Sequence, residues 1–167
     1  GYAAIGGVFA SDEVVAPIAS AGDSFMFFTY GAQDVACAVA DAVLRTIDDE
    51  DLVARADVQG AALRSRLHER LADHPHVGEI RGLGLMLGVS LVADRDGLEP
   101  FPLEEGVHRS VMVEALRRDV WIYPASSGPA APDAVMFGPA FTVTDDELDT
   151  MVDVLAESID AVVSARP

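Results

Sequence analysis

The sequence predicts a chain of the α/β or α+β class, in which helical segments alternate with short strands. Three observations support this prediction: long stretches with apolar residues at helical spacing, short aliphatic stretches bounded by glycine and proline, and a hydrophobic content of 50%. A chain of 167 residues buries roughly 70% of its unfolded surface. Disorder is therefore excluded as the default state, because disorder requires low hydrophobicity.

The first fifty residues predict one strand and two helices. Residues 5–10 form a short aliphatic run after a glycine-rich turn, which is typical of a buried strand. Ser11 is a candidate N-cap for a short helix over 14–18. An aromatic loop over 25–31 follows, and apolar residues at helical spacing over 33–47 predict the next helix.

The remaining residues predict three further helices separated by strands. In chain order these are a helix over 52–71, two strands around a glycine-rich joint within 77–94, a helix over 104–118, strands over 120–123 and 134–140, and a helix that begins after Thr144. Glu147 follows Thr144 at the three-residue spacing of a capping box, which is a strong helix start. A proline between His74 and His76 ends the long helix, and the predicted domain boundary lies there.

The charge balance is strongly acidic, with 28 acidic and 11 basic residues and a formal net charge of −17. Such a surface repels phosphate backbones and anionic lipid headgroups, so neither nucleic acid nor a membrane is an expected partner. No apolar run reaches the roughly 20 residues of a membrane-spanning helix. The single cysteine, Cys37, cannot form an intrachain disulfide, which favours a reducing, cytoplasmic location.

The basic residues are all arginines, and the sequence contains no lysine. Lysine chemistry, a Schiff base included, is therefore excluded for this chain alone. The histidines within 68–76 lack a set of cysteines or carboxylates at ligand spacing, so no metal site is predicted. Arg81, between glycines, is interpreted as part of a structural ion pair in preference to a substrate ligand. Trp121 and Tyr123 are interpreted as strand core, with the lining of a substrate entrance as the alternative.

Four stretches carry a further pattern, and they occur in a fixed order. They are GYAAIGGV at 1–8, FTYG at 28–31 with the alanine-rich helix after it, VGEIRGLGLMLG at 77–88, and FGPAFTVTDDELD at 137–149. Together they resemble the carboxyl-terminal part of class-III aminotransferases, which are pyridoxal-phosphate enzymes of the type I fold. Each motif alone is moderately specific, but four in register are hard to produce by chance.

The resemblance implies a division of the chain into two parts. Residues 1–75 would form the end of the large cofactor-binding domain with the long interdomain helices. Residues 76–167 would form the small carboxyl-terminal α+β domain. The cofactor lysine of the family lies a few residues before the segment that matches Gly1, so the chain is expected to be the carboxyl-terminal portion of a longer enzyme. No catalytic residue is then expected within it, and alone it would be inactive.

The resemblance also implies a function and a cofactor site. The function is amino-group transfer from an amine donor to a keto acid or aldehyde, with pyridoxal 5'-phosphate, in a homodimer with shared active sites. In the family the threonine that matches Thr29 binds the cofactor phosphate of the neighbouring subunit, so Phe28 and Thr29 are the expected cofactor-binding residues. A hydroxyl and a backbone N–H in a loop before a helix also suit a phosphate oxygen. A helix-capping role for Thr29 is the alternative, and Phe25 and Phe27 would lie at the dimer interface or the pocket wall.

Two departures from the family pattern bear on function. Ala-Gln-Asp at 32–34 replaces the Gly-His-Pro of the family, and Met136 stands where some members place an arginine for the substrate carboxylate. The methionine favours a less polar substrate. An aminomutase, decarboxylase or racemase of the same fold remains an alternative, because the fold does not fix the reaction. A non-catalytic interaction module is a further alternative if the chain is complete.

Overall fold

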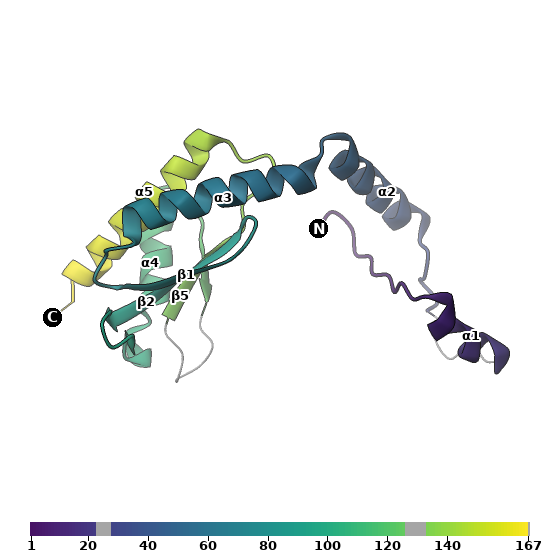
Figure 1. Cartoon of the computed structure of the whole chain (residues 1–167), viewed down its shortest axis with the longest axis horizontal. Helices are drawn as coiled ribbons and strands as arrows, with labels where there is room; N and C mark the ends of the chain where they lie inside the picture. Colours follow the sequence, from purple (N-terminus) through teal and green to yellow (C-terminus); the bar gives the residue numbers. More distant parts are fainter. Residues whose placement is uncertain (23–27, 126–132, 167) are drawn as a thin grey trace. The chain divides into compact units, whose positions relative to one another are not determined.

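The computed structural model describes residues 1–22, 28–125 and 133–166. The described elements are, in chain order, α1 (Asp12–Ser20), α2 (Asp34–Asp49), α3 (Leu52–Leu71), β1 (Val77–Leu83), β2 (Met86–Asp94), β3 (Glu99–Pro100), a 3-10 helix (Leu103–Glu105), α4 (Val107–Leu116), β4 (Tyr123–Ala125), β5 (Asp133–Phe137) and α5 (Asp145–Ser164) (Figure 1). They form two compact units, unit 1 (Gly1–Asp51) and unit 2 (Leu52–Pro167). The predicted division at residue 75 concerns the domains of a longer fold and stays a prediction.

Unit 1 consists of α1, α2 and the segments around them. Both helices are confirmed, but the predicted strand over 5–10 is wrong: this segment has no strand structure. The side chains of Val8 and Phe9 are 90% and 97% exposed, and no described strand offers its backbone groups to theirs. A strand exists only where a neighbouring backbone accepts and donates its hydrogen bonds. Ala36 is the one buried hydrophobic residue in the described part of unit 1, and Cys37 is exposed.

Unit 2 is built on an antiparallel sheet with strand order β1-β2-β5-β4, and β3 pairs with the other end of β2. Helices α3 and α4 pack on this sheet, and α5 packs on both of these helices (Figure 1). Alternate residues of β2 point into the core, and Val89 lies opposite Val135 of β5. One continuous core joins the sheet to the helices, and its fully buried leucines and isoleucines are Leu63, Leu67, Leu71, Leu87, Leu91, Ile122, Leu148, Leu155 and Ile159.

The predicted elements of unit 2 are confirmed with small shifts, except for the strand over 120–123, of which only Tyr123 lies in a strand. The two strands around the glycine-rich joint became β1 and β2, the last helix begins after Thr144 as expected, and β4 starts at Tyr123, where the predicted strand ended. Strand β3 was not predicted, because its two residues carry no periodic pattern. No helix among the described residues is both long and apolar enough to cross a membrane.

The glycine-rich joint is explained by a backbone contact with α3. A Cβ added at Gly60 would clash with the main chain of Gly84, so the main chain of α3 contacts the turn between β1 and β2 directly. Gly84 itself has φ +52° and Gly82 has φ +137°, conformations that other residues rarely adopt. The turn therefore needs glycine for its own shape, and α3 needs glycine at position 60 for its approach to the turn.

A buried pair fixes α4 against β5. Asp133 Oδ2 accepts a hydrogen bond from the backbone N–H of His108 (3.1 Å) in the first turn of α4, where a negative charge is favoured by the helix dipole. The other oxygen, Oδ1, lies 2.8 Å from His108 Nδ1. This second contact is short but does not have the geometry of a hydrogen bond. Both side chains are buried, and sequence reasoning missed them because their partners are far apart in the chain.

Candidate functional site

Each unit contains one hollow that is lined by candidate site residues. The hollow of unit 1 has a volume of about 990 Å³, and its lining comes from 4–8, 28–33 and the start of α2. The glycine-rich segment and the Thr-Tyr loop, which sequence analysis singled out separately, therefore lie on the same hollow. Phe28 and Thr29 both line it. Phe25 and Phe27, the other two aromatic residues expected there, lie outside the described residues.

Thr29 lies in a tight turn at the edge of this hollow. The N–H of Gly31 donates to the carbonyl of Phe28 (2.9 Å), which places Thr29 at the second position of the turn. Its hydroxyl makes no hydrogen bond to another described residue. The N-cap of α2 is Gln33, so the helix-capping alternative for Thr29 is wrong. Among the described residues, none binds the hydroxyl of Thr29.

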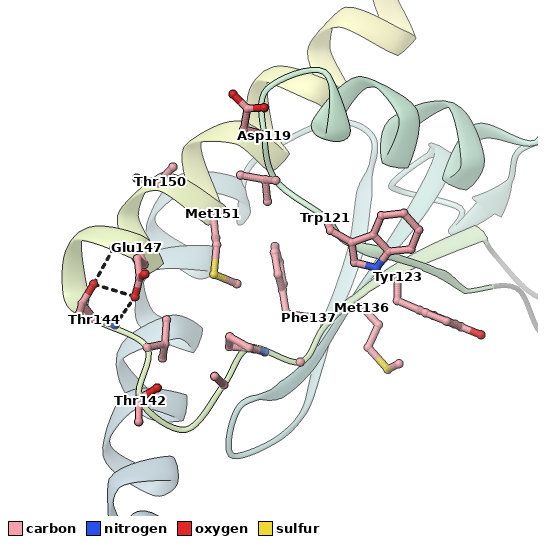
Figure 2. A pocket seen from close by; sticks show the side chains of 15 residues that line it. Asp119, Trp121, Tyr123, Met136, Phe137, Thr142, Thr144, Glu147, Thr150 and Met151 are labelled. Atoms are coloured by element: carbon pink, nitrogen blue, oxygen red, sulfur yellow. Dashed lines mark hydrogen bonds between the residues drawn. The ribbon is translucent and has the colours of Figure 1, made fainter. Parts of the chain in front are cut away.

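The hollow of unit 2, called here the unit 2 cavity, has a volume of about 760 Å³. It lies between β4, the end of β5 and the first turns of α5, and Phe137 and Met151 point into it (Figure 2). Trp121 and Tyr123 line its open side and are 65% and 58% exposed. An aromatic and sulfur-rich lining of this kind suits an apolar group.

The placement of Trp121 and Tyr123 corrects their interpretation as strand core. Ile122, between them, is 1% exposed and fills the core instead. In an extended segment successive side chains point to opposite faces, so the burial of Ile122 turns both neighbours outward. Met136 lies opposite Tyr123 in the pairing of β4 with β5. Met136, which stands where some family members place an arginine, therefore lines the unit 2 cavity together with Tyr123.

The charged groups of the unit 2 cavity are all acidic among its described lining residues. They are Asp119 and Glu147, at the rim. The carboxylate of Glu147 accepts the backbone N–H of Thr144 (2.8 Å) and the hydroxyl of Thr144 (2.9 Å), as Figure 2 shows. The hydrogen bond from that backbone N–H lowers the pKa of Glu147, so this carboxylate stays ionised at neutral pH. The described lining residues of this cavity thus include no cation.

The remaining candidates have structural partners. Arg81 Nη1 lies 3.1 Å from Glu79 Oε2, and both side chains are exposed, so the ion-pair interpretation of Arg81 is confirmed. His74 Nε2 lies 3.1 Å from Asp160 Oδ1, and His76 Nδ1 lies 3.1 Å from the carbonyl of Val92. No group of three metal-ligating side chains gathers within residues 1–22, 28–125 and 133–166.

Comparison with known proteins identifies the class to which this fold and these motifs belong. The model of the family described as aminotransferase class-III matches residues 1–159. The chain therefore belongs to the class-III aminotransferase family. Enzymes of this family depend on pyridoxal phosphate.

Particular relatives agree with this assignment. The chain is 32% identical over 165 residues to "Uncharacterized aminotransferase YodT" of Bacillus subtilis, covering 97% of this chain and 37% of that protein. It is 30% identical over 162 residues to "Gamma aminobutyrate transaminase 1, mitochondrial" of Solanum lycopersicum, covering 95% of this chain and 30% of that protein. The chain thus spans about a third of the length of these relatives.

Solved structures show the same fold. A thermostable (S)-enantioselective omega-transaminase from Thermomicrobium roseum superposes with a TM-score of 0.81 at 35% identity, over 92% of this chain and 33% of that one. A transaminase from the marine bacterium Virgibacillus superposes with a TM-score of 0.82 at 26% identity, over 91% of this chain and 34% of that one. The mixed α/β fold of a type I transaminase is therefore confirmed.

Proposed function

We propose that the whole enzyme transfers an amino group from an amine to a keto acid or aldehyde with pyridoxal 5'-phosphate, and that this chain forms its carboxyl-terminal part. The observation that carries the proposal is the unit 1 hollow. Two segments that match family motifs, 4–8 and 28–31, line one space and leave the Thr29 hydroxyl without a described partner. A space so arranged suits the phosphate end of a cofactor.

The residues of the hollow fit the phosphate group and not the reacting end of the cofactor. The hydroxyl and backbone N–H of Thr29 would donate to a phosphate oxygen, and Phe28 would form the adjacent wall. No lysine exists in this sequence, so the lysine that holds the cofactor must come from elsewhere in the enzyme. When bound, pyridoxal phosphate supplies the electron sink of the reaction. The part of this chain is to bind and orient it.

The unit 2 cavity supports an amine substrate with an apolar side. Met136, Trp121 and Tyr123 form its wall, and its two charged groups are carboxylates. A carboxylate of the substrate would be repelled there, whereas an aromatic or alkyl group would be desolvated. Several solved structures to which the chain is similar are described as omega-transaminases, and two of them as engineered for asymmetric synthesis of "enantiopure bulky amines". This agreement favours bulky amines over α-amino acids.

A homodimer with shared active sites and a cytoplasmic location belong to the same proposal. Apolar side chains of unit 1 are exposed in this chain, among them Val8, Phe9, Phe28 and Tyr30. Several large apolar side chains exposed in one unit are expected to be covered by another protein surface. The single free cysteine is compatible with a reducing compartment.

The first test uses the full-length protein. It should be yellow, with absorption at about 410–430 nm that borohydride removes, and it should convert an amine and a keto acid into the exchanged products. A screen of bulky amines and amino acids identifies the donor. A full-length protein that neither contains nor takes up the cofactor would overturn the proposal.

The second test addresses Thr29. Replacing Thr29 by Ala in the full-length enzyme should weaken cofactor retention by about 1–3 kcal/mol, because a hydrogen bond to a charged group is lost. Titration of the apoenzyme with pyridoxal phosphate measures this. The matched control is Thr46→Ala, since the hydroxyl of Thr46 is exposed and bonds only the carbonyl of Ala42 within α2. Equal retention in both variants would exclude Thr29 from the phosphate site.

A further inference from the structure

One wall of the unit 2 cavity is an irregular segment, residues 138–143, which joins β5 to α5. Pro139 has no N–H to donate. The N–H of Val143 donates to the carbonyl of Ala140 (3.0 Å), which lies within the same segment. These local features shape the segment but do not attach it to the rest of unit 2.

Two side chains of α3 make that attachment. Arg55 Nε donates to the carbonyl of Phe141 (2.9 Å), and Arg55 Nη2 donates to the carbonyl of Val143 (2.9 Å) and, at 3.5 Å, to that of Thr142. Gln59 Nε2, one turn further along α3, donates to the same carbonyl of Val143 (3.1 Å). The planar guanidinium group holds several donors in one rigid fork, which suits three successive carbonyls.

Arg66 provides a contrast on the same helix. Its guanidinium lies 3.1 Å from Asp145 and 2.5 Å from Asp149, both on α5, and the hydrogen bond to Asp149 raises the pKa of Arg66. None of these three residues lines the unit 2 cavity. Arg66 therefore joins two helices by ion pairs, whereas Arg55 directs its donors to main-chain carbonyls of the cavity wall.

We propose that Arg55 and Gln59 are positioning residues: they hold the 138–143 wall in place and so set the affinity of the unit 2 cavity for the apolar side of the amine. This rests on the proposed function, because the cavity is taken to receive the substrate. Neither residue touches the reacting atoms. Their effect passes through the main chain of the wall, whose Thr142 and Val143 line the cavity.

The test uses the full-length enzyme with Arg55→Met, which keeps the aliphatic stem and removes every donor, and Gln59→Leu. Arg66→Met is the matched control, because it removes the same group from the same helix. Amide hydrogen exchange over residues 138–144 should become about tenfold faster in Arg55→Met and stay unchanged in Arg66→Met. With a bulky amine, KM should rise about tenfold while kcat stays within about twofold. Arg55→Lys, which retains the charge and some donors, should recover part of the KM.

The outcomes separate this inference from the proposed function. Unchanged exchange over 138–144 in both Arg55→Met and Gln59→Leu overturns the inference, whatever reaction the enzyme catalyses. Faster exchange with unchanged KM for every amine also overturns it, since the hold on the wall would then not affect binding. Cofactor uptake and turnover with small amines report on the proposed function itself. If Arg55→Met does not fold, Arg55→Lys and Gln59→Leu, which remove fewer donors, provide the same two measurements.

Discussion

At Gly60 the main chain of α3 lies so close to the turn at Gly84 that no side chain fits between them. Replacing Gly60 by Ala should force the helix and the turn apart and destabilise unit 2 by about 1–3 kcal/mol, the usual cost of overpacking. The gain in helix propensity, about 1 kcal/mol, offsets only part of this cost. Thermal or urea unfolding, followed by circular dichroism, measures the change.

Gly88 provides the control for this prediction. A Cβ there would meet only two carbonyl oxygens at 3.8 Å, an ordinary contact, and its φ is not in the left-handed region. Gly88→Ala should therefore leave the stability within about 0.5 kcal/mol of the parent or raise it slightly. Equal destabilisation by both substitutions would contradict a specific helix-to-turn contact at Gly60.

At the scale of the element, the start of α5 depends on a reciprocal cap. Thr144 Oγ1 accepts the backbone N–H of Glu147, and the Glu147 carboxylate accepts the N–H of Thr144. Thr144→Ala should cost about 1 kcal/mol, because one first-turn N–H loses its partner. Unfolding by urea at neutral pH measures this cost.

The same cap predicts a pH dependence. Its hydrogen bonds lower the pKa of Glu147 in the folded protein, so the contribution of Glu147 is complete above the ordinary glutamate pKa of about 4.3 and disappears as the pH falls through the lowered value. The difference in Tm between the parent and Glu147→Gln should therefore shrink in acid. Asp146→Asn, in the same turn but outside the cap, is the control. A pH-independent difference in Tm would contradict this account.

Elements that depend on residues close together in the sequence could be predicted, and features that depend on residues far apart in the sequence could not. The cap at Thr144 and the apolar stripe of α3 each depend on residues only a few positions apart, and both predictions were correct. The segment at 5–10 has the composition of a strand but no described partner. For Trp121 and Tyr123, a strand pattern predicts that successive side chains face opposite sides. Only the contacts with the neighbouring sheet decide which of the two sides is buried. The contacts of Arg55 with residues 141–143 span more than eighty positions and leave no pattern in the sequence.

At the scale of the whole molecule, the two units differ in how much core they contain. All the buried hydrophobic residues among those described, except Ala36, belong to unit 2. A fragment of residues 52–167 should therefore fold alone and unfold in one cooperative transition, whereas residues 1–51 alone should show none. Far-ultraviolet circular dichroism during heating tests both fragments.

Limited proteolysis gives an independent check. In the chain of 167 residues, early cleavage should fall within residues 1–51 and leave a resistant product that begins near Leu52, which is itself buried. Mass spectrometry of the product identifies its ends. A resistant product that extends through unit 1, or rapid loss of 52–167, would contradict the independence of unit 2.

The attachment of the 138–143 segment through its carbonyls has a consequence for how this enzyme can change. Arg55 and Gln59 recognise atoms that every amino acid possesses, so the side chains at Ala140 and Thr142 are free to vary without loosening the backbone that carries them. If the cavity receives the substrate as proposed, side-chain atoms of this segment would set the substrate range, and main-chain atoms would hold the segment in place. Selection, or a designer, can reshape the cavity at these positions while the scaffold beneath stays the same.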